Sequence, residues 1–516
     1  MSAEFRETRS IWTPQAPPRP AETLRQDLAT DVCVVGAGLS GLTVAYLLAC
    51  EGRRVVVLDM LGPGAGETGR TTAHLANAID DRIFNLRRWR GDDVARLAVE
   101  SHLAAIDRIE SIVREEGIDC DFRRLDGYLF PAEGHGRESL DEELAAAQAV
   151  GMHDATIVAR PFPGLAWLEV ALRFRAQGRF EPLRYLWALH GALVRRGGIV
   201  YSGARAVDLQ DGDTVAIETA HGPVVRAGAA VIATNVPFTR FSFHTKMAAY
   251  RTYASAFELA SGVVSDALLW DTADPYHYVR LARDDGSGGA LLIVGGEDHR
   301  TGQQEDEGSA AFAALDAWTR QRFPIGAARQ RWSGQVMETL DGLGYIGPLP
   351  GSGSRTFVAT GDSGMGMTHG TIAGMLLTDL IQGRENPWAE IYDPGRKPLA
   401  AAGTFARENF NVARQYLDWA RAPAGDPLED LPRGSGALFR HGGRRAAIFR
   451  DADGTLHACS AVCPHLRCLV SWNPTEHTWD CPCHGSRFDR YGKLLHGPAT
   501  SDLEPLPAAA DEAARH

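Results

Sequence analysis

Two short segments near the C-terminus each bring a cysteine and a histidine close together. The first reads Cys463-Pro-His465, and the second reads Cys481-Pro-Cys-His484. Thiolates and imidazoles are ligands for both zinc and iron. Four of them can hold one tetrahedral zinc ion, or a cluster of two irons in which thiolates bind one iron and imidazoles the other. The first hypothesis is therefore a metal centre. If the metal centre is a cluster of two irons, the protein is a one-electron carrier.

The distribution of the ligands separates these alternatives. Zinc modules usually pair Cys with Cys and His with His, whereas each segment here supplies one of each. The pattern resembles the Rieske [2Fe–2S] family, with zinc as the alternative. The resemblance implies that Cys463 and Cys481 bind the inner iron, and that His465 and His484 bind the outer, more exposed iron.

Residues beside these ligands extend the resemblance. In the disulfide-bearing subtype, the cysteines at the positions of Cys468 and Cys483 are joined, although two free thiols would also fit this spacing. Ser486 stands where the family places a hydroxyl that bonds a cluster sulfide. High-potential members carry Tyr at the position of Phe488. Because hydrogen bonds to the sulfurs stabilise the reduced cluster, Phe488 predicts a middling reduction potential.

A second signature lies in residues 31–59. An apolar strand leads into Gly-x-Gly-x-x-Gly, and a helix over Leu42–Glu51 and a second strand over Val55–Leu58 follow. Glycines at this spacing allow a tight turn, close approach of a pyrophosphate and close packing of helix on strand, while the helix N-terminus faces the phosphates. The residues predicted to hold the dinucleotide are Gly36, Gly38, Leu39, Ser40, Gly41 and, for a ribose hydroxyl, Asp59.

Later segments favour FAD over NAD. Thr360–Gly370 precedes the apolar run Ile372–Ile381, and no second Gly-x-Gly-x-x-Gly is present. Together with 231–237 and 341–348, these segments resemble the D-amino acid oxidase, glycine oxidase and sarcosine oxidase family over residues 31–390. The resemblance implies further FAD contacts at Arg70, Thr71, Thr72, His74, Val207, Gly361, Gly364, Met365, Gly366 and Met367.

His74 has two interpretations. Some relatives attach FAD covalently to a histidine in this neighbourhood, but the spacing here differs. We expect a non-covalent contact or simple packing.

The substrate site is predicted from the segment Trp270–Arg280. If Tyr276–Arg280 is a strand, Tyr276, Tyr278 and Arg280 share one face, and an Arg can bind a carboxylate through two hydrogen bonds. Relatives use a Tyr/Arg pair as a substrate anchor. The alternative is a surface ladder or a structural ion pair.

The predicted fold class is α/β, with a Rossmann-like FAD-binding domain, an inserted α+β substrate domain and a C-terminal all-β Rieske domain. Helices are expected near Asp92–Glu116 and Ser309–Arg322. The expected parts are an N-terminal arm at 1–30, an oxidoreductase at 31–395 (FAD-binding about 31–114, 181–239 and 336–395; substrate about 115–180 and 240–335), a helix (Ala401–Arg421) and linker within 396–432, and the Rieske domain at 433–510.

Composition is compatible with this division. The chain has 516 residues, 44% of them hydrophobic, and a net charge of −12. This length fits two to four domains, and the charge argues against nucleic acid as a partner. No apolar run reaches membrane-spanning length and no signal segment is evident, so we expect a cytoplasmic protein. A homo-oligomer is compatible with the sequence.

The function predicted is oxidation of the C–N bond of an amine or amino acid by FAD, with electrons leaving through the Rieske cluster to an external acceptor or oxygen. A Rieske-type oxygenase is rejected, because the chain after His484 is too short for a mononuclear iron domain. Two alternatives stay open. One is an electron carrier or redox sensor without an organic substrate, and the other is oxidation of a C–O or C–C bond by the same fold.

Overall fold

The structure is a computed structural model of the 516-residue chain. It describes residues 8–13, 22–239, 243, 245–260, 262, 264–284, 289–303, 308–397, 428–441 and 444–507. The helix predicted over Ala401–Arg421 and most of the linker that follows lie outside the described residues.

The first sheet is eight-stranded and mostly parallel. Its strand order is β16-β17-β10-β1-β2-β7, and β9 and β8 extend it from β10. The four apolar residues of β2, predicted as a strand, are all buried. The strands are β1 (Leu28–Val35), β2 (Val55–Leu58), β7 (Ile199–Tyr201), β8 (Ala206–Gln210), β9 (Val215–Thr219), β10 (Val224–Ile232), β16 (Tyr345–Pro348) and β17 (Thr356–Thr360).

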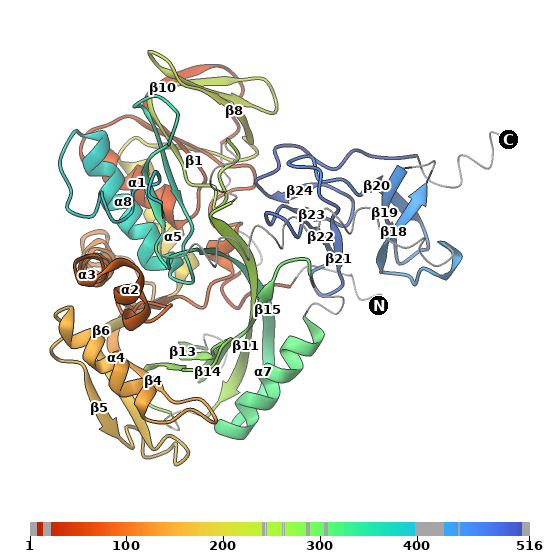
Figure 1. The fold of residues 1–516 in the computed structure, drawn as a ribbon. Helices are drawn as coiled ribbons and strands as arrows, with labels where there is room; N and C mark the ends of the chain where they lie inside the picture. The colour runs from red at the N-terminus through yellow and green to blue at the C-terminus, as the bar shows by residue number, and fades with distance from the viewer. Residues whose placement is uncertain are drawn as a thin grey trace.

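Helices pack on this sheet through an apolar core. α1 (Leu39–Cys50) starts three residues before the predicted helix and packs against α5 (Pro182–Arg195) and α8 (Gly366–Ile381). A Cβ at Gly374 of α8 would lie 2.4 Å from Thr43 of α1, so glycine permits this close approach. α3 (Asp92–Glu116), which has the predicted bounds, covers α8 (Figure 1). The shorter helices α2 (Ile83–Arg90) and α4 (Glu138–Ala149) pack together.

The second sheet has nine strands in the order β15-β11-β14-β13-β12-β4-β6-β3, with β5 beside β6. α7 (Ser309–Arg322), also with the predicted bounds, covers β11, β14 and β15. β3 joins this sheet although the sequence assigned its residues to the FAD-binding part. The strands are β3 (His74–Leu75), β4 (Arg123–Phe130), β5 (Thr156–Ala159), β6 (Val170–Arg179), β11 (Met247–Leu259), β12 (Leu268–Asp271), β13 (Tyr278–Arg283), β14 (Ala290–Arg300) and β15 (Ile325–Thr339).

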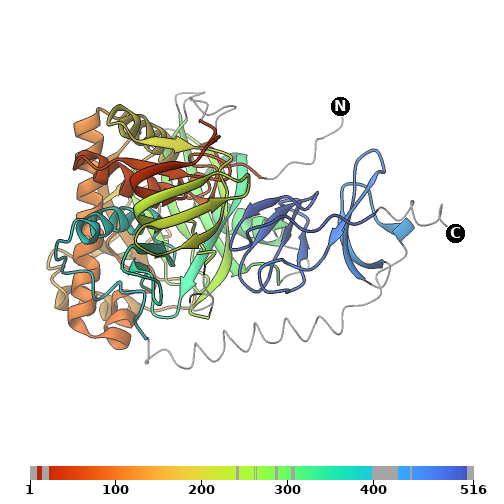
Figure 2. The ribbon, with the colours of Figure 1, turned by 90° about the horizontal axis from the view of Figure 1, so that it is seen from above.

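The C-terminal module consists of two small antiparallel sheets. β18 (Gly436–His441), β19 (Arg444–Arg450) and β20 (Leu456–Ser460) form one, and β21 (Ser471–Asn473), β22 (Thr478–Asp480), β23 (Arg487–Asp489) and β24 (Leu494–His496) form the other. Figures 1 and 2 show β21–β24 next to the larger domain and β18–β20 farther from it.

Buried charges join this module to the larger domain. Glu476, whose side chain is fully buried, lies 3.3 Å from Arg70 and 3.9 Å from Arg487. Arg251, also buried, lies 3.4 Å from Asp480. Burial would raise the pKa of Glu476, but Arg70, Arg487 and Arg251 outweigh burial and lower it to about 2. The carboxylate is therefore charged at neutral pH and binds arginines from both parts of the chain.

We expect Glu476→Gln to destabilise the docked protein strongly. Removing one partner of a buried ion pair leaves an uncompensated charge and typically costs about 3–5 kcal/mol. The free energy of unfolding should be measured in urea at pH 7 on the holoenzyme. Glu504→Gln is the matched control, because Glu504 and its partner Arg444 are 67% and 68% exposed, and it should change stability by less than about 0.5 kcal/mol. Equal midpoints for the two variants would contradict the role of Glu476.

Candidate functional site

A cavity of about 980 Å³ lies between the two sheets. The loops after β1, β2, β10 and β17 line one part of it, and residues of β11, β13, β14 and β15 line another. Residues 494–500 of the C-terminal module also contribute to the wall. The cavity therefore touches all three parts of the fold.

The glycine loop after β1 forms one end of the cavity. Gly36 has φ +110°, and a Cβ there would lie 2.3 Å from the carbonyl oxygen of Ala233. A Cβ at Gly41 would lie 1.9 Å from the carbonyl oxygen of Gly36, which explains why α1 can follow the strand so tightly. Gly36, Gly38, Leu39 and Ser40 line the cavity, whereas Gly41 does not and serves packing. This cradle fits a pyrophosphate.

Asp59 directly follows β2 and also lines the cavity. Its Oδ2 accepts a hydrogen bond from the Ala37 amide at 2.7 Å, and its Oδ1 accepts from the amides of Leu61 and Gly62 at 2.8 and 2.6 Å. Burial raises the pKa of Asp59, while these three amides oppose the shift. The carboxylate is thus held at the place where a ribose hydroxyl could donate to it.

The loop between β17 and α8 also lines the cavity. Gly361 and Gly364 have φ +72° and +77°, and a Cβ at Gly364 would lie 2.2 Å from Asp80. Together with Met365, Gly366 and Met367, they line the cavity at the N-terminus of α8. A helix N-terminus attracts an electron-rich group, so this end suits the polar edge of a flavin ring.

The segment before β3 runs along the cavity. Arg70, Thr71, Thr72 and His74 all line it. The Nδ1 of His74 lies 3.1 Å from the Thr72 hydroxyl, and its Nε2 lies 3.4 Å from the carbonyl oxygen of Val279. Burial lowers the pKa of His74 to about 3, so the ring is neutral. Val207 does not line the cavity, although its neighbours Arg205 and Ala206 do.

The proposed substrate anchors separate into two groups. Tyr276 and Tyr278 line the cavity, where their hydroxyls lie 2.6 Å from Asp80 and Thr252. Arg280 shares the face of Tyr278 in β13 but does not line the cavity. Its guanidinium donates to the backbone carbonyls of Ala73 and Phe180 at 2.6 and 3.1 Å. β13 also begins at Tyr278, so Tyr276 precedes the strand rather than belonging to it.

The sequence did not reveal an acidic group in the wall. The carboxyl groups come from four separated segments, and their sequence spacing carries no signal. Burial raises the pKa of Asp80 and Asp362 to about 6 and that of Asp81 and Asp298 to about 7. Burial and the neighbouring acids raise the pKa of Glu338 well above its usual range. The lining also contains Phe84, Trp89, Tyr250, Trp270, Tyr276 and Tyr278.

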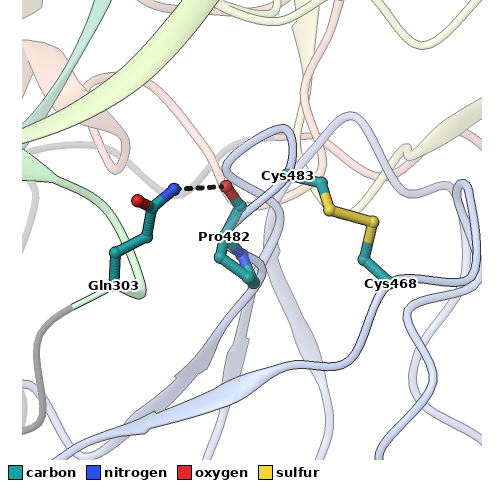
Figure 3. The surroundings of a disulfide bond; sticks show 4 residues. All are labelled: Gln303, Cys468, Pro482 and Cys483. Atoms are coloured by element: carbon teal, nitrogen blue, oxygen red, sulfur yellow. Dashed lines mark hydrogen bonds between the residues drawn. A yellow bond between two sulfur atoms is a disulfide. The ribbon is translucent and has the colours of Figure 1, made fainter. Parts of the chain in front are cut away.

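The four predicted metal ligands converge in the C-terminal module. The thiols of Cys463 and Cys481 are in hydrogen-bond contact, and the rings of His465 and His484 lie 5.1 Å apart. Cys468 and Cys483 form a disulfide (Figure 3). Their sulfurs and that of Cys481 lie within 4.8 Å of one another, but the disulfide leaves only Cys481 of the three as a ligand. Two thiolates and two imidazoles at one place suit a mixed-ligand [2Fe–2S] cluster.

Ser486 and Phe488 lie beside these ligands, and both are fully buried. The Ser486 hydroxyl contacts Cys463 and accepts a hydrogen bond from the Ala499 amide at 3.1 Å. Phe488 packs in the same apolar cluster as Cys463 and Cys481. The hydroxyl of Ser486 therefore reaches the sulfur of the ligand Cys463. The side chain of Phe488 offers no hydroxyl and supplies only an apolar ring.

Comparisons with known proteins agree with both halves of this geometry. Residues 31–380 match the model of the family described as FAD dependent oxidoreductase, and residues 425–507 match that of the Rieske [2Fe-2S] domain. The chain belongs to the FAD-dependent oxidoreductase family. It carries a C-terminal Rieske domain, and the two domains bind FAD and a [2Fe–2S] cluster.

Relatives share all or part of this arrangement. The Rieske 2Fe-2S iron-sulfur protein YhfW of Bacillus subtilis (strain 168) is 32% identical over 94% of each chain. Gamma-glutamylputrescine oxidoreductase of Escherichia coli (strain K12) is 26% identical over 70% of this chain and 86% of its own. The crystal structure of glycine oxidase from Geobacillus kaustophilus has the same fold, with a TM-score of 0.60 and 18% identity over 72% of this chain and 99% of its own.

The oxidoreductase is an enzyme with a small-molecule cavity. Among the described residues, no helix combines the length and apolar composition needed to cross a bilayer.

We expect Phe488→Tyr to raise the reduction potential of the cluster. A hydroxyl that reaches a ligand sulfur adds a hydrogen bond to the reduced cluster, and a bond worth about 1 kcal/mol corresponds to about 40 mV for one electron. Redox titration followed by EPR measures the shift. Phe449→Tyr, elsewhere in the same apolar cluster, is the control. An unchanged potential in Phe488→Tyr would show that the missing hydroxyl does not tune the cluster.

Acid treatment tests the state of His74. Because both ring nitrogens have partners within the chain, we expect FAD to be released into the supernatant when the protein is precipitated with acid. Yellow colour retained by the pellet would show a covalent bond to the protein. Mass spectrometry of flavin-labelled peptides would then identify the attached residue.

Proposed function

We propose that the protein oxidises a cationic amine at its C–N bond and delivers the electrons through its Rieske cluster to an external one-electron acceptor. The observation that carries this proposal is the cavity wall, which combines FAD-binding loops with buried carboxyl groups and aromatic rings. The relatives support an amino-group substrate, since their names give gamma-glutamylputrescine and glycine.

The charge of the wall favours a cation over an amino acid held by its carboxylate. Among the described residues, Asp81, Asp298 and Glu338 have no ion-pair partner, and Arg280 is held away by backbone carbonyls. Uncompensated buried carboxylates are costly, and this cost appears as their raised pKa values. An ammonium group bound among them would stabilise their charged forms. The faces of Tyr276 and Tyr278 would add cation–π attraction.

The acidic residues also provide a path for a proton. An alkylammonium must lose a proton before the adjacent carbon is oxidised, and a carboxylate of raised pKa is a suitable acceptor. Asp298 fits this role, because its Oδ1 is buried and has no hydrogen-bond partner among the described residues. FAD, when bound, supplies the two-electron acceptor for the hydride from that carbon. The resulting imine takes up water and separates into a carbonyl compound and an amine.

The Rieske domain gives the electrons an exit. Direct oxidation of the flavin by oxygen would need no cluster, so its presence supports an acceptor other than oxygen. The electrons of one substrate molecule would therefore leave singly, through two reductions of the cluster.

An anaerobic substrate screen tests the proposal. Holoenzyme is mixed with matched pairs, such as a diamine and the amino acid in which a carboxylate replaces one ammonium group. We expect the diamine to bleach the flavin and the amino acid to do so more weakly. Preferential bleaching by the amino acids would contradict the cationic substrate. Bleaching by no amine or amino acid would contradict the proposed reaction and favour a carrier.

The acidic wall predicts a pH-dependent KM. The pKa values of Asp81 and Asp298 are raised to about 7, so both carboxylates become charged as pH rises through 7. The KM for a cationic amine should therefore decrease as the pH rises from about 6 to about 8. This range extends about one unit on either side of the pKa values of Asp81 and Asp298.

Asp298→Asn should raise KM and flatten this pH dependence. Loss of a charge-assisted hydrogen bond of roughly 1.5–3 kcal/mol corresponds to a rise of about 10- to 100-fold. Asp93→Asn is the control, because the Asp93 side chain is 94% exposed on α3. A rising KM with pH in the wild type would contradict the ionic role of the wall.

A further inference from the structure

A two-stranded ribbon lies between the FAD cavity and the cluster-binding loop of the Rieske domain, although residues near 494–500 of that domain also reach the cavity wall. β11 and β15 pair antiparallel, with Ala249 opposite Met337 and Arg251 opposite Gln335. β15 is the edge strand of the second sheet, and Figure 1 shows it beside the β21–β23 region. Since successive side chains of a strand point to opposite faces, the ribbon presents one face to each domain.

The inner face of the ribbon lines the cavity. Ala248, Tyr250 and Thr252 of β11 and Val336 and Glu338 of β15 are all part of the wall. The lining residues alternate along β11, as expected for one face, whereas on β15 Gly334, Gln335 and Thr339 also reach the cavity.

The outer face of the ribbon carries the cluster-binding loop. Gln335 donates from Nε2 to the carbonyl oxygen of Gly485 at 3.1 Å, and Gly485 directly follows the ligand His484. A Cβ at Gly485 would lie 2.8 Å from the Cβ of Ala249 and 2.8 Å from the Nε2 of Gln335. Only glycine therefore allows the loop to lie this close. Gln335 also lines the cavity, so one residue contacts both compartments.

The end of β14 and the residues after it hold the same loop from another side. A Cβ at Gly302 would lie 3.2 Å from the Cα of Pro482, which follows the ligand Cys481. Gln303 donates from Nε2 to the Pro482 carbonyl at 3.5 Å, next to the Cys468–Cys483 disulfide (Figure 3). The loop with Cys481 and His484 is thus seated on the oxidoreductase at two places.

We propose that the cluster is reduced by the flavin of its own chain, directly across the β11–β15 ribbon and without movement of the Rieske domain. Gln335 and Ala249 act as positioning residues that fix the loop against this wall. The proposal rests on the proposed function only for the source of the electrons. The wall would carry electrons from flavin reduced by any means.

The transfer balances simply. A hydride brings two electrons and one proton to the flavin. Each electron would then pass singly across the ribbon to the cluster that Cys463, Cys481, His465 and His484 would hold, and each transfer would reduce one ferric ion to ferrous. An external one-electron acceptor oxidises the cluster between the two transfers, and the proton is released to solvent.

Buried charges argue against a mobile Rieske domain. Undocking would expose Glu476, Asp480, Arg251 and Arg487, whose side chains are 0–2% exposed. It would also break the contact of Ser333 with Glu476 and that of Gln335 with Gly485. Glu476 pairs with Arg70 and Asp480 pairs with Arg251 across the interface, so a docked state is strongly favoured.

Laser-flash photoreduction of the FAD in the anaerobic holoenzyme tests the route without any amine. Recovery of flavin absorbance and bleaching of the cluster give the transfer rate. We expect a first-order rate that does not change with protein concentration or with added glycerol. A rate proportional to protein concentration would overturn transfer within one chain, and a rate that falls with viscosity would overturn the fixed domain.

Variants test the wall itself. Ala249→Leu should push the loop outward and slow the transfer several-fold, while the cluster keeps its EPR spectrum and reduction potential. Ala327→Leu, at an exposed position near the start of the same ribbon, should leave the rate unchanged. Gln335→Met removes the donor with little change in size and should also slow the transfer. If Ala249→Leu does not retain its cluster, the transfer rate of Gln335→Met tests the wall in its place.

Wild-type rates in both Ala249→Leu and Gln335→Met would overturn the route. The result does not depend on the substrate. If the flash experiment succeeds and no amine bleaches the flavin, the proposed function fails and the route stands. If amines bleach the flavin and the cluster is not reduced, the route fails together with the electron-delivery part of the proposed function, while amine oxidation stands.

Discussion

The structure depends on burying charge between two domains. Glu476 and Asp480 from the Rieske domain meet Arg70 and Arg251 from the oxidoreductase, almost out of contact with water. Such groups are stable only while every partner stays in place. Their pairing therefore fixes the cluster-binding loop on the β11–β15 ribbon, and the same ribbon is a wall of the FAD cavity. The position of the cluster relative to the flavin site follows from this one constraint.

The carboxyl groups of raised pKa in the cavity differ from those of the interface, because among the described residues they lack paired cations. At the interface each carboxylate has an arginine, and the pKa of Glu476 is lowered to about 2. In the cavity the carboxyl groups outnumber nearby cations, and the pKa values of Asp81 and Asp298 are raised to about 7. The first arrangement is complete within the chain and serves docking. The second is completed by a cationic ligand, and this difference is the basis of the proposed substrate class.

The parts predicted best from sequence depend on short, contiguous patterns. β2, α3 and α7 have the predicted bounds, and the Gly36–Gly41 loop and the cysteine and histidine ligands follow local spacing. Arg280 shares the face of Tyr278 but does not reach the cavity, because strand periodicity gives the face of a residue and not the reach of its side chain. The acidic wall and the interdomain contacts could not be predicted, because Asp80, Asp298 and Glu338 meet only through tertiary packing.

We infer that substrate electrons cross from the flavin to the cluster of the same chain. Rapid freeze-quench EPR measures this most directly, after anaerobic mixing of holoenzyme with an amine that bleaches the flavin. We expect the signal of the reduced cluster to appear after the flavin bleaches, with a first-order rate that is the same at all protein concentrations. A cluster that stays oxidised while the flavin is fully bleached would contradict it.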